Sequence, residues 1–233
     1  MRTATTMNEA ALYRLMAWLS PSYPLGAYSY SHGLEFAVER GLVRDADSLL
    51  AWIGTILSRG AGRIDGAVLA AAWRAVCNDD EMGLQAVAEQ AAAWRGSAEL
   101  ALESEAQGAA FLATTRSAWP HPALERLAAA QVGRAIALPV AVGVAAASHG
   151  IALAPALAAY LQAFAANLVS AGIRLIPLGQ SAGQRAVAAL EKAVADAARA
   201  AGEAELEEIG TSALIVDWCS MQHETQYTRL FRS

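Results

Sequence analysis

Apolar residues recur at helical spacing through almost the whole chain, and no segment alternates apolar and polar residues with a convincing period of two. Leu12, Leu15, Met16 and Leu19 illustrate this spacing, because together they line one face of a helix. We therefore predict an all-α fold, a single-domain multi-helix bundle over residues 1–233 without significant β-sheet.

The two ends of the chain do not share this pattern. Residues 1–7 precede the first helical repeat, and residues 224–233 are polar and aromatic without a continuous apolar stripe. Chain ends of this kind are commonly poorly ordered. We therefore expect a flexible N-terminus at 1–7 and a flexible C-terminal tail at 224–233.

Charge and cysteine content exclude several classes of function. The formal net charge is -5, the pI is near 5.4, and Lys and Arg are scattered singly, so we expect no binding to nucleic acid or anionic membrane. Cys77 and Cys219 form no CxxC pair, which argues against a disulfide framework or a structural zinc site. The N-terminus lacks the apolar core of a secretory signal. These features predict a cytoplasmic protein.

Residues 135–173 contain no Asp, Glu, Lys or Arg, which raises the question of a membrane span. Pro139 and Pro155 interrupt the stretch, Gln162 and Asn167 lie within it, and alanine contributes little to insertion. We interpret it as two helices buried on most faces, inside the domain or at a subunit interface, and predict no membrane span.

One segment resembles a hydrolase motif. Residues 179–183 match G-x-S-x-G around Ser181, and Asp217 and His223 follow in the order of a catalytic triad. That motif requires a strand before the serine and a sheet to hold it, which the helical pattern does not provide. We predict instead that Ser181 caps a helix and that the chain is no enzyme, with a serine hydrolase using Ser181 as the remote alternative.

Metal and nucleotide binding also lack a complete motif. Cys219 and His223 are four residues apart, so on a helix they would share a face and could hold a soft divalent ion. Two ligands make an incomplete site, and we predict no metal site, with this pair as the candidate. Residues of a phosphate-binding G-x-x-x-x-G-K-[ST] loop are missing from the sequence.

Two clusters have a composition typical of protein interfaces. Residues 23–35 are rich in tyrosine, small hydroxyl residues and glycine, and residues 221–233 combine Met, Tyr, Arg and Phe. Such clusters indicate surfaces that a partner covers. The alternative is that the first cluster packs on its own domain and the second is a loose tail.

Three separated motifs resemble the UreF family of urease accessory proteins. They are the block at 20–35, which starts Ser-Pro-Ser-Tyr-Pro-Leu-Gly, the Pro-Leu-Gly-Gln block at 177–180, and the His-Glu-Thr-Gln-Tyr-Thr-Arg-Leu-Phe-Arg-Ser block at 223–233. The resemblance implies an all-helical, homodimeric, non-enzymatic scaffold. It would join the accessory protein UreD and the GTPase UreG on apo-urease during nickel insertion. The complex, and not this chain, would handle nickel and GTP.

The same resemblance implies which residues bind partners. Residues of the first motif would form one surface or pocket, and residues of the other two would form opposite, partner-facing elements. The implied partner-binding residues are Tyr28, Ser29, His32, Glu35, Arg174, Pro177, Gln180, Asp217, Ser220, Met221, His223, Glu224, Tyr227, Arg229 and Phe231. Gln222 departs from the family, which often has Arg there. The alternative function is modulation of the UreG GTPase, with Arg174 or Arg185 acting on the transition state as an arginine finger.

Overall fold

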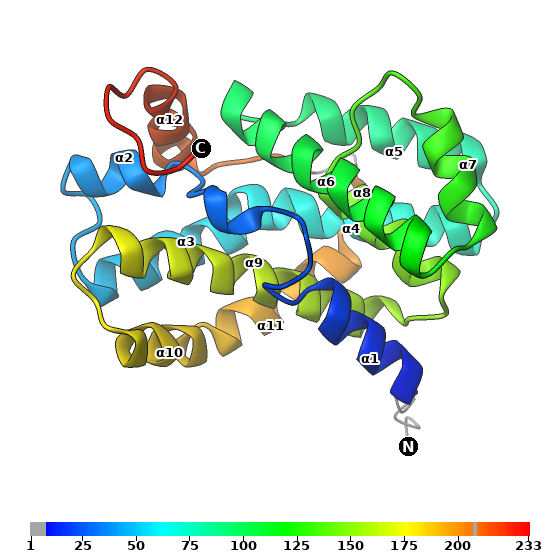
Figure 1. Ribbon diagram of the computed structural model, residues 1–233, viewed down its shortest axis with the longest axis horizontal. Coiled ribbons are helices and arrows are strands. Elements are labelled where there is room, and N and C mark those ends of the chain that lie inside the picture. The colour runs from blue at the N-terminus through cyan, green and yellow to red at the C-terminus, as the bar shows by residue number, and fades with distance from the viewer. Residues whose placement is uncertain (1–7, 207–208) are drawn as a thin grey trace.

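The computed structural model describes residues 8–206 and 209–233, and every regular element within them is helical (Figure 1). The elements are α1 (Glu9–Trp18), the 3-10 helix η1 (Ala27–Ser29), α2 (Leu34–Glu39), α3 (Ala46–Arg59), α4 (Ala61–Cys77), α5 (Glu81–Ala93), α6 (Ala98–Ala118), α7 (Pro122–Ala130), α8 (Leu138–Ser148), α9 (Leu153–Leu175), α10 (Gln180–Ala189), α11 (Glu191–Glu203) and α12 (Leu214–His223). The predicted all-α fold is confirmed. The expectation for residues 1–7 lies outside the described residues.

Helix α4 forms the centre of the bundle and packs against α3, α5, α8, α9 and α11. Its most extensive partner is α8, whose residues from Pro139 to Ala146 are all buried. The two helices approach closely because small residues face each other. A Cβ at Gly143 would lie 2.7 Å from the Leu69 carbonyl oxygen. The alanine-rich, uncharged stretch therefore builds the core of the domain.

Of the described helices, α9 alone is long and apolar enough to cross a membrane by length and composition. A core helix of a soluble protein meets the same criteria. Half of the most apolar 18-residue window of α9 is buried in this chain, where the helix packs on α3, α4, α10 and α11. This is the packing predicted for residues 135–173 as two buried helices.

Three boundaries differ from the predicted ones. The helical spacing of the sequence predicts one helix over residues 123–136 and another over residues 181–201. The first ends at Ala130, and the second is divided at Leu190 into α10 and α11. Leu190 is buried and its N–H reaches the carbonyls of Ala186 and Val187, which closes α10. The predicted cap at Ser181 is wrong, because α10 begins at Gln180 with Gly179 as its cap.

The C-terminal tail was expected to be flexible, but in this structure it follows a path defined by internal contacts. Figure 1 shows it returning from α12 to lie beside α2 and the N-terminal loop. The Arg232 N–H donates to the Ser29 carbonyl at 2.8 Å, and the Ser31 N–H donates to the Ser233 carbonyl at 2.8 Å. Phe231 is buried. The tail therefore has partners within its own chain that its composition did not reveal.

Candidate partner-binding site

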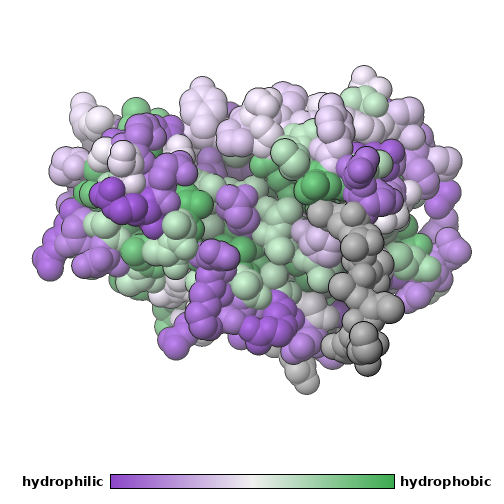
Figure 2. Space-filling view, turned by 90° about the horizontal axis from the view of Figure 1, so that it is seen from below, coloured by the Kyte–Doolittle hydropathy of each residue, from purple (hydrophilic) through white to green (hydrophobic). Residues whose placement is uncertain are grey.

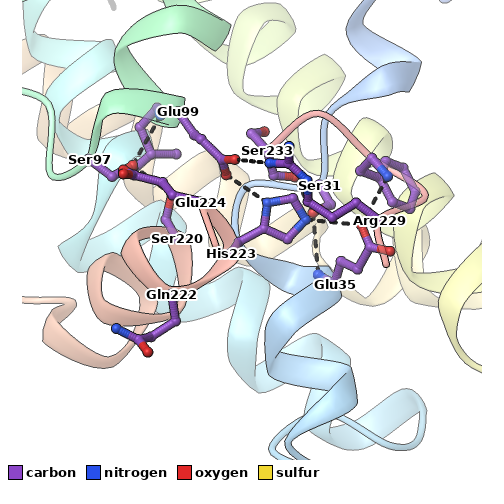
Figure 3. A network of polar contacts seen from close by, with 12 residues as sticks. Ser31, Glu35, Ser97, Glu99, Ser220, Gln222, His223, Glu224, Arg229 and Ser233 are labelled. Carbon is purple, nitrogen blue, oxygen red and sulfur yellow. Dashed lines mark hydrogen bonds and ion pairs between the residues drawn. The ribbon is translucent and has the colours of Figure 1, made fainter. Parts of the chain in front are cut away.

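Glu35, in the first turn of α2, holds the main chain of the tail (Figure 3). Its carboxylate is 8% exposed and accepts the Leu230 N–H at 2.6 Å and the Phe231 N–H at 2.9 Å. Gly33 allows the start of α2 to lie close to α12. It adopts a left-handed φ of +74°, and a Cβ at this residue would lie 2.8 Å from the Ser220 nitrogen. The glycine thus lets α2 sit directly against α12.

His223, at the end of α12, connects Glu35 on α2 to Glu99 on α6. Its side chain is fully buried, with Nδ1 2.6 Å from Glu99 Oε2 and Nε2 3.0 Å from Glu35 Oε2. Arg229 Nη1 donates to the other oxygen of Glu99 at 2.6 Å. When the imidazole carries both protons, two positive and two negative groups balance in this network. It therefore links α2, α6, α12 and the tail in one polar cluster, which we call the tail anchor: Glu35, Glu99, His223 and Arg229.

A second group of polar contacts holds the last residue. Ser31 Oγ donates to the Ser233 carbonyl, and Ser233 Oγ donates to Glu103 Oε2 at 2.8 Å. His32 Nδ1 lies 3.4 Å from the same oxygen of Glu103. Ser31, His32 and Ser233 are all buried. The end of the chain is therefore held between the N-terminal motif and α6.

Helix α12 is also attached to the start of α6. Ser97 and Ser220 share a hydrogen bond of 2.7 Å between their hydroxyls, and the Ala98 N–H donates to Glu224 Oε1 at 3.0 Å. Ser97 at the same time caps α6 by accepting the Leu100 N–H. Ser220 and Glu224 thus orient the helix that carries His223.

Arg174, in the last turn of α9 and three residues before the motif at 177–180, lies at the same place. Its guanidinium carbon lies 4.4 Å from the centroid of the Phe231 ring and 6.0 Å from that of Tyr28. Pro177, in the turn that follows α9, and Gln180, the first residue of α10, are both exposed. The family resemblance implied that Arg174 lies on an element opposite the N-terminal motif. The structure corrects this, because Arg174 lies within stacking distance of both Tyr28 and Phe231.

Around the tail anchor, several large apolar side chains face solvent. Leu214, Ile215, Trp218 and Met221 project from α12, and Tyr227 in the tail is fully exposed. Asp217, on the same helix, is half-buried and accepts from Thr211 Oγ1 at 3.1 Å. Gln222 points away from the network in Figure 3. The outer surface here thus combines large apolar and aromatic side chains with the exposed Glu224 and Arg229, while Glu35, Glu99 and His223 are buried.

The predicted site residues divide into two sets by exposure. Those that are buried are His32, Glu35, Ser220, His223 and Phe231, and those that are exposed are Tyr28, Arg174, Pro177, Gln180, Met221, Glu224, Tyr227 and Arg229. Ser29 and Asp217 lie between these classes. The buried residues shape the site from within, and the exposed ones are available for contact.

Glu99 and Glu103 were not among the predicted site residues, because the charged, alanine-rich composition of residues 79–117 predicts helices with a solvated outer face. Both are buried, together with Gln107, on one face of α6. Their spacing of four residues was the available signal, since i, i+4 and i+8 share a face. A charged face on an alanine-rich helix resembles a solvated one until its partners are known.

The geometry does not support the two alternatives of a serine-hydrolase triad and a metal site. Both ring nitrogens of His223 contact carboxylates, and Asp217 contacts Thr211, so these two prospective triad members are engaged away from Ser181. Burial raises the pKa of the Cys219 thiol to about 11, which keeps it protonated at neutral pH. Within the described residues, no group of three or more His, Cys, Asp and Glu side chains is placed to hold a metal ion.

Known proteins resemble this chain along nearly its whole length. The sequence profile of the UreF family matches residues 43–191. The urease accessory protein UreF of Granulibacter bethesdensis is 53% identical over 231 residues, covering 98% of this chain and 97% of that protein. The protein of the same name from Rhodopseudomonas palustris strain BisB5 is 53% identical over 226 residues, covering 97% and 93%. The one from Methylorubrum populi is 50% identical over 220 residues, covering 94% and 98%.

The chain belongs to the UreF family. This confirms the resemblance that the three motifs indicated, and the chain is a urease accessory protein by family. In this member of the UreF family the first and last motifs meet at the tail anchor, although about 200 residues separate them in sequence, and Arg174, three residues before the second motif, lies beside them. The exposed residues there include Tyr28 from the first motif, Tyr227 from the last motif, and Arg174.

Proposed function

We propose that this chain is a non-enzymatic scaffold that joins UreD and the GTPase UreG on apo-urease while nickel is inserted. The observation that carries the proposal is that the first and last family motifs and Arg174 meet at one exposed surface. We call this surface the rim; its exposed residues are Tyr28, Arg174, Leu214, Ile215, Trp218, Met221 and Tyr227. These residue types are enriched where proteins bind one another. The tail anchor beneath them holds the rim in a defined shape, so less ordering is needed on binding.

This proposal assigns the chemistry to the assembled complex. UreG would bind GTP, and nickel would pass to urease, while this chain would hold its partners in place in the cytoplasm. The engaged state of His223 and the protonated thiol of Cys219 support a role without a resident metal.

The test is co-elution of the chain with UreD and UreG in size-exclusion chromatography. We expect Met221→Ala together with Tyr227→Ala to weaken or abolish the complex, because both side chains are exposed on the rim. Met82→Ala is the matched control, since Met82 is 85% exposed on α5, outside the rim. If the wild-type chain fails to co-elute with either partner, with or without GTP, the proposal is wrong.

Modulation of the UreG GTPase is the second candidate. Arg174 is exposed at the rim and Arg185 is exposed on α10, so both guanidinium groups face solvent from neighbouring helices. An arginine finger raises GTP turnover by about 10³–10⁵-fold in other systems. We expect Arg174→Ala or Arg185→Ala to lower GTP turnover in the assembled complex. Equal turnover in the wild type and both variants would exclude this role.

A homodimer is part of the proposed scaffold. Figure 2 shows apolar surface gathered across the middle of the face on which α1, α9, α10 and α11 lie. Leu12, Tyr13 and Met16 on α1 are exposed, and half of the apolar window of α9 is not fully buried. Light scattering should give twice the chain mass for the wild type. Met16→Glu should shift the mass toward that of one chain.

A further inference from the structure

A cavity of about 230 Å³ lies beneath the N-terminal loop, between residues 19–28, α6 and α9. Aromatic side chains line it, including Tyr23, Tyr28 and Phe164, and the polar groups of Glu103 and Gln107 reach it from α6. Its walls are tied in place: Tyr23 shares a hydrogen bond of 2.8 Å with Thr115, and Asn167 Nδ2 donates to the Ala27 carbonyl at 3.0 Å. Tyr23 and Asn167 are therefore held in position by hydrogen bonds within the chain.

The described lining of this cavity contains an acidic side chain and no basic one. Among the described residues that line it, Glu103 alone carries a charge, and Glu103 is 6% exposed. Oε2 of Glu103 takes the contacts from Ser233 and His32, and Oε1 has a single long contact of 3.4 Å to Gln107. A carboxylate surrounded by aromatic rings favours a cation, since the ring faces are electronegative. Oε1 is the oxygen with capacity for a further donor.

The volume of the cavity limits the size of the ligand that it can hold. Pockets for drug-sized molecules and cofactors typically measure about 300–1,000 Å³, so this cavity suits one side chain rather than a nucleotide or cofactor. A guanidinium group is planar, stacks on aromatic rings and pairs with carboxylates, and it keeps its charge at any physiological pH.

We propose that this cavity receives an arginine side chain presented by a protein partner, with the guanidinium directed to Glu103 and stacked among the rings of Tyr23, Tyr28 and Phe164. The net charge of -5 favours approach of such a basic segment. The inference rests on the proposed scaffold function and gives that scaffold a specific anchor point. Tyr28 belongs to both the cavity and the rim, which makes the two surfaces continuous.

The first experiment uses the chain alone, so it does not depend on the proposed function. Backbone amide shifts are followed by NMR during titration with n-butylguanidinium or with its neutral isostere n-butylurea. We expect saturable shifts around Gln107 and Tyr160 with n-butylguanidinium, and at least fivefold weaker binding of n-butylurea. Glu103→Gln should weaken n-butylguanidinium at least tenfold, since the amide can still accept from Ser233 and His32 while the charge is lost.

A second variant controls for damage to the tail contacts of Glu103. Ala163 lines the cavity from α9, so Ala163→Phe should fill the space and abolish the shifts while leaving Glu103 and the chromatographic mass unchanged. Equal binding of the two probes, or normal binding by Ala163→Phe, would overturn the proposal.

The third step identifies the source of the arginine. Wild type and Ala163→Phe are compared for co-elution with the urease accessory partners. We expect the wild type to co-elute and Ala163→Phe to lose at least tenfold in affinity. If both bind partners equally, the cavity is no docking site although the scaffold function stands. If the wild type does not bind them, the scaffold function fails and the probe titration still reports on the cavity.

Discussion

At the scale of single residues, the site depends on carboxylates whose partners are far away in sequence. Glu35 accepts two main-chain N–H groups of the tail, and Glu99 lies between His223 and Arg229. The identity of Glu35 and His223 as site residues was implied by family resemblance. Their buried position, and the participation of Glu99, could not be inferred, because each depends on contacts across more than 120 residues.

Glu35→Ala should release the tail. The change leaves two N–H groups and one side of His223 without their acceptor, and breaking a buried pair of this kind costs about 3–5 kcal/mol. Urea unfolding should show the loss, and limited proteolysis should cut the tail faster. Glu39→Ala, at an exposed position of the same helix, should change neither measurement. Equal protease resistance of the tail in wild type and Glu35→Ala would contradict the anchor.

Tyr160 gives the chain a predictable response to alkaline pH. Its buried hydroxyl donates to Asp65 at 2.8 Å, and burial together with the charge of Asp65 raises the pKa of Tyr160 well above 10.0. Above pH 10 the unfolded chain loses this proton while the folded chain keeps it, so the free energy of unfolding falls as pH rises. Denaturant titrations from pH 9 to 11 should show a steeper fall for the wild type than for Tyr160→Phe. Parallel curves would contradict the assignment.

At the scale of helices, the type of element follows from the sequence and the boundaries follow from packing. Apolar spacing was sufficient to predict helices over most of the chain. The break at Leu190 was not visible, because it results from burial of that side chain between α10 and α11. Helix α12 was not predicted either, since large apolar residues such as Leu214 and Trp218 face outward, while its buried stripe is mostly small or polar.

The contact of α2 with α12 should depend on the glycine between them. Gly33→Ala combines a left-handed φ with a Cβ 2.8 Å from the Ser220 nitrogen, and strain of each kind typically costs about 1–3 kcal/mol. Gly26→Ala is the matched control, because Gly26 has a similar φ of +70° with nothing within 4 Å of its Cβ. We expect the melting temperature to fall further for Gly33→Ala. Equal losses would show that backbone conformation alone matters at both positions.

At the scale of the whole molecule, the important fact is that segments from both ends and from the middle of the chain meet at one place. The sequence indicated three motifs and predicted that they serve partners. It could not show that Tyr28, Arg174 and Phe231 lie together, because helical periodicity carries no information on which distant elements are neighbours.

Removal of residues 225–233 tests this convergence. A loose tail could be removed without loss of stability, whereas here the change uncovers Glu35, Glu99 and Glu103 and deletes the buried Phe231. We therefore expect a clear fall in melting temperature and faster exchange of amide protons in α2. A truncated chain as stable as the wild type would show that the tail contributes nothing to the fold.

Glu35 recognises the tail through main-chain N–H groups, and this has a consequence for variation at its exposed positions. Leu230 is 66% exposed while its N–H is held by Glu35. Nineteen of the twenty amino acids carry that N–H, and only proline lacks it. The outward chemistry at position 230 can therefore diverge between relatives, and adapt to different neighbours, while the path of the backbone beneath it stays the same.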